Sequence, residues 1–262
     1  INVASAGAID LSSAGTSTKG YAVTSTGTSA VTGSDDADAL TNTSGATTYV
    51  GGDGIDTWVI TDGAVTISDL GAGGLADVVD LNDGTVAATA TGAWTASAAT
   101  DNAGADNTEF SIAVASAGAV DLTSAGVSAA GYTVTSTGTS AITGSAGADA
   151  LTNTSGNATF VGGAGIDTFT ATAGAMTISD LGAGGLVDIV DLNDGATVVG
   201  TATGAWTASS ATDNDSGSTN AAFSIAVASA GAIDLSSAGT TDAGYTVTST
   251  GTSAVTGSDD AD

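Results

Sequence analysis

The sequence contains no cysteine, no proline and no histidine, and it has one lysine (Lys19) and one glutamate (Glu109). Without cysteine the chain has neither disulfides nor thiol chemistry. The usual zinc ligands are missing because histidine and cysteine are both absent. The general base of the common nucleophilic triads is missing with histidine. We therefore expect no enzymatic activity in this segment.

Positive charge is also scarce, since 28 acidic residues face a single basic one and give a net charge of -27. Such a surface repels nucleic acid and anionic lipid, and it attracts cations. The chain has no apolar run long enough to span a membrane, so we expect no membrane span. Acidic, aromatic-poor sequences are often disordered. Here 42% of the residues are hydrophobic and the aspartates recur at fixed places, which favours a folded chain.

Internal repetition is the main feature that is present. The heptapeptide TSTGTSA begins at Thr24, Thr135 and Thr248, and TISDLGAGGL begins at Thr66 and Thr177. These repeats recur about every 112 residues and predict tandem units rather than unrelated domains. We place the units at residues 1–110, 111–223 and 224–262, the last being the start of a third unit. We expect one continuous solenoid and a segment of a longer chain, because the sequence stops within a motif.

A finer period of nine residues lies inside each unit. GSDDADALT (33–41), NTSGATTYV (42–50) and GGDGIDTWV (51–59) follow one another directly. Related nonapeptides start at 144, 153 and 162 in the second unit. Each combines a six-residue turn with a short strand. One large apolar residue per strand is predicted to point inward: Leu40, Tyr49, Trp58, Leu151, Phe160 and Phe169.

This pattern resembles the G-G-x-G-x-D-x-U-x repeat of RTX proteins, a family of calcium-binding bacterial proteins with a parallel β-roll. The stretch TISDLGAGGLADVVDL (66–81) is similar to the sequence that follows many RTX arrays. The resemblance implies an all-β, right-handed parallel β-roll or β-solenoid in which two nonapeptides form one coil. It also implies Ca²⁺ as the bound ion and secretion, by bacterial type I export, to the cell surface or medium.

Calcium sites are expected where aspartates at position six of the nonapeptide stack, eighteen residues apart. Asp38 and Asp56 form one such pair, and Asp149 and Asp167 form the other. Adjacent strands lie about 4.8 Å apart, so two carboxylates would repel each other unless a hard cation lay between them. Asp262 provides half of a third site. The middle nonapeptides have Thr47 or Ala158 at position six, and we expect no calcium at that edge.

The first site departs from the motif, because Ser34 and Asp36 stand where glycine is expected. The second unit has Gly147 in place of Asp36 and follows the motif more closely. A second acidic group in each unit is either a further calcium site or interface bridge, or a set of solvated turn residues. Its members are Asp69, Asp77, Asp80 and Asp83, and then Asp180, Asp188, Asp191 and Asp194.

The rest of each unit is predicted to form short strands, including residues 8–13, 21–26, 64–69, 77–82, 85–90 and 110–115. The segment at 101–108 and its counterpart at 213–220 depart from the pattern and are expected to loop out. Trp94 and Trp206 could stack on a sugar or pack in the core, and packing is the commoner role.

These features favour a structural protein that self-associates through neighbouring repeat units into an extracellular fibre, sheath or surface layer stabilised by calcium. An alternative is the extender region of a large adhesin, including one of the ice-binding type with a flat threonine face. Another alternative is the non-catalytic secretion and folding tail of an exported enzyme. A fibre subunit is expected to repeat throughout, whereas an adhesin is expected to end in a distinct domain.

Overall fold

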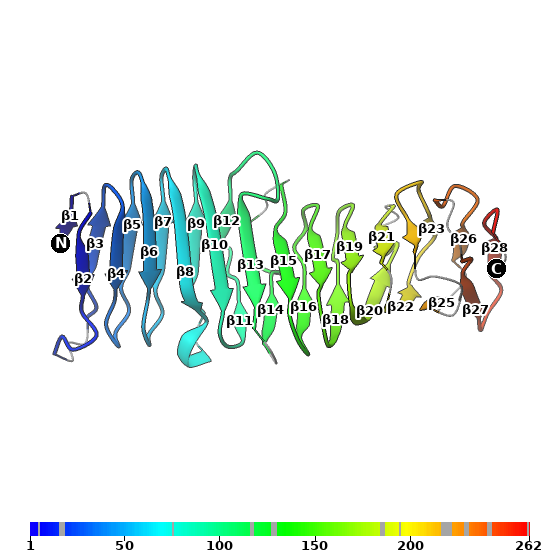
Figure 1. Cartoon of the computed structure of the whole chain (residues 1–262), viewed down its shortest axis with the longest axis horizontal. Helices are drawn as coiled ribbons and strands as arrows, with labels where there is room; N and C mark the ends of the chain where they lie inside the picture. Colours follow the sequence, from blue (N-terminus) through cyan, green and yellow to red (C-terminus); the bar gives the residue numbers. More distant parts are fainter. Residues whose placement is uncertain are drawn as a thin grey trace. The chain divides into compact units, whose positions relative to one another are not determined.

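The computed structural model describes residues 1–4, 6–15, 19–74, 76–115, 118–126, 130–183, 187–193, 195–215, 222–227, 231–239, 243–260 and 262. Within these residues the secondary structure is 28 short β-strands and one 3-10 turn, η1 (Ala72–Gly74). Neighbouring strands in each sheet run parallel to each other. The chain is therefore an all-β parallel solenoid, which confirms the prediction of an all-β fold with parallel coils (Figure 1).

The chain divides into two compact structural units, residues 1–133 and 134–262, whose bounds differ from those of the sequence repeats. Below, "first unit" and "second unit" refer to these two structural units. The strands of the first unit are β1 (Asn2–Val3), β2 (Ala8–Asp10), β3 (Ala22–Ser25), β4 (Ser29–Thr32), β5 (Ala39–Asn42), β6 (Ala46–Val50), β7 (Thr57–Ile60), β8 (Ala64–Leu70), β9 (Val78–Leu81), β10 (Thr85–Ala90), β11 (Trp94–Thr95), β12 (Asp101–Asn102), β13 (Phe110–Val114) and β14 (Ala119–Asp121). One sheet has the order β1-β3-β5-β7-β9-β12, a second has β2-β4-β6-β8-β10-β13, and β11 pairs with β14.

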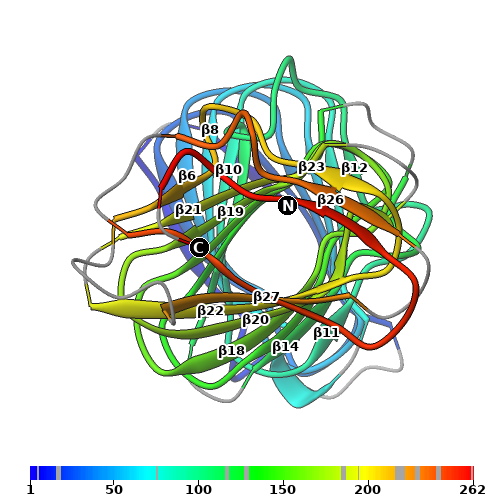
Figure 2. The ribbon, with the colours of Figure 1, turned by 90° about the vertical axis from the view of Figure 1, so that its right-hand side faces the viewer.

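The strands of the second unit are β15 (Thr133–Ser136), β16 (Ala141–Thr143), β17 (Ala150–Asn153), β18 (Asn157–Val161), β19 (Thr168–Ala171), β20 (Gly174–Leu181), β21 (Ile189–Leu192), β22 (Ala196–Ala202), β23 (Trp206–Thr207), β24 (Asp213–Asn214), β25 (Phe223–Val227), β26 (Ala232–Asp234), β27 (Thr246–Ser249) and β28 (Ala254–Thr256). The sheet orders are β15-β17-β19-β21-β24, β16-β18-β20-β22-β25-β27 and β23-β26-β28. In each unit, alternate strands therefore join different sheets as the chain coils (Figure 2).

Coils of eighteen residues occur in the nonapeptides and in the strands directly beside them. Ala39 pairs with Thr57, and Ala150 pairs with Thr168, both eighteen residues apart. This spacing confirms that two nonapeptides form one coil. Thr57 then pairs with Val78, twenty-one residues later, because η1 lengthens that coil.

The core of each unit is formed by alternate residues of each strand, whose side chains point inward. Strands alternate between buried and exposed residues, as expected when only one face packs inside. All six residues predicted to point inward are at most 1% exposed: Leu40, Tyr49, Trp58, Leu151, Phe160 and Phe169. Trp94 and Trp206 are 1% exposed as well, which confirms packing over an exposed sugar platform.

The strands predicted for the rest of the repeat are present as β2, β3, β8, β9, β10 and β13. The segment expected to loop out begins differently, because Asp101 and Asn102 form β12 and pair with Asp80 and Leu81. Residues 216–220 of the corresponding segment lie outside the described residues. The described residues contain no helix long and apolar enough to cross a membrane.

Candidate metal centre

The turn between β4 and β5 holds Asp38 in a fully hydrogen-bonded position. The backbone N–H of Tyr21, one coil earlier, donates to Asp38 Oδ1. The backbone N–H of Ser34 donates to Asp38 Oδ2 at 2.7 Å. The Ser34 hydroxyl lies 3.2 Å from the same oxygen. Ser34, which departs from the motif, therefore supports the aspartate directly.

Asp56 occupies the equivalent place in the turn between β6 and β7. Its Oδ1 accepts the backbone N–H of Asp38 at 2.8 Å. Asp77, in the next coil, accepts the N–H of Asp56 at 3.0 Å through Oδ1 and the N–H of Gly71 at 2.8 Å through Oδ2. We call the series Asp38, Asp56 and Asp77 the aspartate ladder, since each carboxylate binds the backbone of the coil before it.

The second unit repeats the ladder with Asp149, Asp167 and Asp188. Asp167 Oδ1 accepts the N–H of Asp149 at 2.9 Å, and Asp188 Oδ1 accepts the N–H of Asp167 at 3.2 Å. Asp262 reproduces the position of Asp38, because it accepts the backbone N–H of Tyr245 at 3.0 Å. The arrangement is thus a property of the repeat and not of one turn.

Burial makes the ladder electrostatically costly. Asp38, Asp56 and Asp77 are at most 2% exposed. The pKa of Asp56 is raised to about 8, chiefly by burial; the carboxylates of Asp77, Asp38 and Asp69 contribute to this rise, and the hydrogen bond from the Asp38 N–H opposes it.

Burial likewise raises the pKa of Asp167 to about 8, with Asp149, Asp188 and Asp180 as its charged neighbours. The pKa values of Asp77 and Asp188 are also raised, chiefly by burial. Each ladder therefore needs a proton, a cation or additional hydrogen bonds to offset its buried negative charge.

Asp69 also lies at this edge of the solenoid, but it binds the backbone of a turn with both of its oxygens. Its two oxygens accept the backbone N–H groups of Gly51 and Gly52, both at 2.9 Å. Asp180 does the same with Gly162 and Gly163 in the second unit. Successive N–H groups at a turn form a natural anion-binding concavity.

Glycine permits this edge because the turns stack backbone against backbone. Gly52 has φ +101°. A Cβ placed on it would lie 2.1 Å from the carbonyl oxygen of Ser34. Gly163 repeats this geometry with φ +101° and a distance of 2.2 Å to Ser145 O. Ser34 itself has no positive φ, so the first and third nonapeptide turns differ in backbone conformation.

The remaining predicted acidic residues lie elsewhere. Asp80 pairs in register with Asp101, and it accepts the Asn82 side-chain amide at 3.1 Å. Asp83 accepts the N–H of Gly84 at 2.8 Å, as a solvated turn residue does. Asp191 pairs with Asp213, and Asp194 lies outside the described residues.

Burial, followed by the charge of Asp215, raises the pKa of both Asp191 and Asp213. The structure thus divides the second acidic group. Asp69 and Asp77, like Asp180 and Asp188, lie beside the nonapeptide aspartates, whereas Asp80 and Asp191 belong to other strand columns.

A calcium ion requires six to eight oxygen ligands at about 2.3–2.6 Å. Asp38, Asp69 and Asp77 instead direct both oxygens at backbone N–H groups, whose positive ends oppose a cation. In the described part of the chain, no three acidic side chains are grouped closely enough to hold a metal ion. This arrangement of side chains does not fit a cation shared by Asp38 and Asp56. Calcium binding at the repeat stays a prediction of the motif.

One oxygen is an exception to this saturation. Asp56 Oδ2 is buried and has no hydrogen-bond partner. A Cβ on Gly51 would lie 2.2 Å from it, so the oxygen fills the space that glycine leaves open. Asp56 is therefore the ladder position with a free acceptor.

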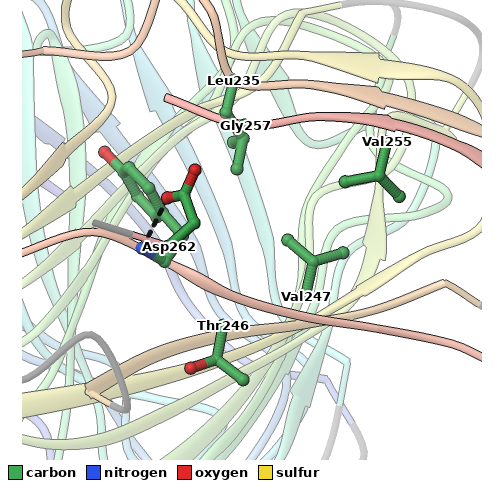
Figure 3. A pocket seen from close by; sticks show the side chains of 7 residues that line it. Leu235, Thr246, Val247, Val255, Gly257 and Asp262 are labelled. Atoms are coloured by element: carbon green, nitrogen blue, oxygen red, sulfur yellow. Dashed lines mark hydrogen bonds between the residues drawn. The ribbon is translucent and has the colours of Figure 1, made fainter. Parts of the chain in front are cut away.

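The second unit also has an apolar hollow lined by Leu235, Tyr245, Thr246, Val247, Val255, Gly257 and Asp262 (Figure 3). Val255 is 44% exposed there, whereas the equivalent residues Val31 and Ile142 are 1% exposed beneath the neighbouring strands β6 and β18. Among the described residues that line the hollow, the ionisable side chains are the carboxylate of Asp262 and the phenol of Tyr245.

Sequence reasoning missed the role of Asp77 and Asp188 as members of the ladder. Their signal was a spacing of twenty-one residues from Asp56 and Asp167, which an eighteen-residue coil conceals. It also missed that Trp94 Nε1 donates to the Asp77 carbonyl at 3.1 Å, and that Trp206 Nε1 donates to Asp188 at 3.0 Å. These tryptophans hold the last position of each ladder.

Comparison with known proteins adds no assignment. No protein-family model matches the chain, and neither a curated protein nor a solved structure is significantly similar to it.

Proposed function

We propose that this chain is a structural protein, part of a repetitive β-solenoid that builds an extracellular fibre, sheath or surface layer. The observation that carries the proposal is the near-identity of successive repeats, each folded into the same parallel coils and the same aspartate ladder. A stack of parallel coils can be extended by further strands, because the backbone hydrogen bonds between coils do not depend on side-chain identity. Length is then set by the number of repeats.

Association through coil faces supports the same proposal. Within each unit the apolar face of one coil is covered by the next coil, as Val31 is by Tyr49 in β6 and Ile142 by Phe160 in β18. Covering such a face buries apolar surface and pairs free backbone groups, and solenoid stability comes largely from contacts between neighbouring repeats. The partner that fits best is another copy of the repeat.

Calcium enters the proposal through the charge. A net charge of -27 on 262 residues opposes compaction and lateral contact. Divalent cations bound by exposed turn carboxylates would reduce both costs, and binding to the folded form alone would stabilise it. We infer a chain that is less stable at the submicromolar calcium of a cytoplasm and more stable outside the cell. A relationship to the RTX family is part of this proposal, supported by glycines with positive φ at positions two and four of the third nonapeptide.

Electron microscopy of the chain at high protein concentration in millimolar calcium tests the proposal, with a parallel sample in chelator. We expect uniform filaments in calcium that shorten or dissolve after chelation. Monomers under both conditions would contradict a fibre subunit. Rods that never associate end to end would instead favour the extender region of an adhesin.

A further inference from the structure

The aspartate ladder joins coils through the backbone of the aspartates themselves. The N–H of Asp38 donates to Asp56, and the N–H of Asp56 donates to Asp77. Both groups are buried, so water cannot replace the acceptor when it is removed. A buried N–H without an acceptor is rare in folded proteins because its desolvation is not compensated. The carboxylate therefore completes the backbone hydrogen bonding of the preceding coil.

Two ladder positions differ in how many acceptors they supply. Asp38 uses both oxygens, one for Tyr21 N–H and one for Ser34 N–H. Asp56 uses only Oδ1, and its Oδ2 is buried without a partner. Asparagine has a single acceptor oxygen beside a donor NH₂. Asparagine can therefore replace Asp56 without loss of the ladder bond, but it cannot replace both acceptors of Asp38.

Charge favours the same exchange at Asp56. Its carboxyl group lies near those of Asp38, Asp69 and Asp77, and an amide there stays neutral at every pH, so that no buried negative charge can arise at this position. The amide NH₂ would take the place of Oδ2 beside these acidic groups, whose charge favours a donor there over a second carboxyl oxygen. A calcium ligand would behave in the opposite way, since a neutral amide binds the ion more weakly than a carboxylate does.

We propose that Asp56 and Asp167 are hydrogen-bond acceptors that join successive coils in the absence of calcium, and that they are not calcium ligands. These two, among the residues predicted from the repeat motif as ion ligands, thus have a structural role that an amide can fill. The ladder holds the turn edge together, and any response to calcium arises from other carboxylates.

The test uses the 262-residue chain and its variants Asp56→Asn, Asp56→Ala and Asp38→Asn. Asp53→Asn is the matched control because Asp53 is an exposed carboxylate in the same turn. Urea unfolding is measured in chelator and again in millimolar calcium. Each variant then has an unfolding equilibrium constant without calcium and a calcium-induced shift of its midpoint.

In chelator we expect Asp56→Asn to be at least as stable as Asp53→Asn. Asp56→Ala leaves the Asp38 N–H without an acceptor and is expected to raise the unfolding constant about 5- to 150-fold. Asp38→Asn is expected to raise it by a similar factor, because one of two N–H groups loses its acceptor. The calcium-induced shift of Asp56→Asn is expected to equal that of the unchanged chain.

Two results would overturn the proposal. One is a calcium-induced shift that falls in Asp56→Asn but not in Asp53→Asn, because that would make Asp56 a ligand. The other is an Asp56→Ala chain that is as stable in chelator as the unchanged one, because the hydrogen bond would then contribute nothing. If Asp56→Ala does not fold in chelator, the comparison of Asp56→Asn with the unchanged chain gives the decision, and Asp167→Asn repeats it in the second unit.

Discussion

Close stacking of turn backbones makes a quantitative prediction for four glycines of the second unit. Gly163 has φ +101° and its Cβ position is 2.2 Å from Ser145 O. Gly195 has φ +83° and open space around it. Gly144 lies outside the left-handed region, but its Cβ position is 2.2 Å from Gly162 O. Gly251 has neither constraint. Alanine at each position separates backbone strain from steric contact.

The expected losses follow from those two terms. A left-handed conformation costs a non-glycine residue about 1–2 kcal/mol, which is the prediction for Gly195→Ala. Forcing a methyl group into a packed place costs about 1–3 kcal/mol, the prediction for Gly144→Ala. Gly163→Ala meets both and should lose about 2–5 kcal/mol. Gly251→Ala should be neutral or gain up to about 1 kcal/mol, since alanine restricts the unfolded chain.

The assay is urea unfolding followed by far-ultraviolet circular dichroism, with all four variants in the same buffer and at fixed calcium. Far-ultraviolet dichroism reports the loss of strands throughout the unit. Gly251→Ala should be the most stable variant and Gly163→Ala the least stable. Gly195→Ala and Gly144→Ala should lie between them. A Gly163→Ala chain no less stable than Gly195→Ala would refute the stacking of turn carbonyls against glycine.

Three further outcomes are expected. Because burial raises the pKa of Asp56 and Asp167 to about 8, the folded chain binds more protons than the unfolded one from about pH 4 to pH 8. Each residue should then lower the unfolding free energy by up to about 1.4 kcal/mol per pH unit as pH rises through that window, and a urea midpoint in chelator that rises instead would contradict this burial. Trp206→Phe should cost about 1 kcal/mol through the lost bond to Asp188, and Trp206→Ala about 3–5 kcal/mol; equal stability of the two in thermal unfolding would argue against a packed indole. Raising the salt concentration in chelator should stabilise the chain by screening its charge, and a midpoint that does not move with salt would exclude repulsion as a major term.

The sequence was sufficient to predict the coil where the nine-residue period is strict. Leu40, Tyr49 and Trp58 repeat at that spacing, and the strands that carry them pair as the period requires. The alternation of apolar and small polar residues then decides which face of each strand is buried. This information is local, so it can be taken from the chain without a structure.

The longer coils could not be predicted in the same way. Insertions such as η1 add residues to a turn without changing the strands on either side, so the strand pattern alone does not give the spacing between Asp56 and Asp77. From the sequence, Asp77 and Asp188, which lie twenty-one residues after Asp56 and Asp167, therefore fall into a separate acidic group. The structure places them in the same column because strand pairing, and not residue count, sets the coil.

The chemical role of the turn aspartates was the harder inference. From sequence, a pair of stacked carboxylates such as Asp38 and Asp56 implies repulsion that only a cation can offset. The folded backbone supplies another partner, since N–H groups of the preceding coil point at the same oxygens. A sequence pattern does not reveal the direction of those N–H groups, which depends on turn conformation.

We propose that the stack of parallel coils extends into a fibre. X-ray diffraction from oriented filaments, grown from the concentrated protein in millimolar calcium, tests it most directly. Strands that run across the axis should give a sharp meridional reflection at about 4.8 Å, the spacing between successive coils. Filaments without that reflection, or with it on the equator, would contradict growth by coil stacking.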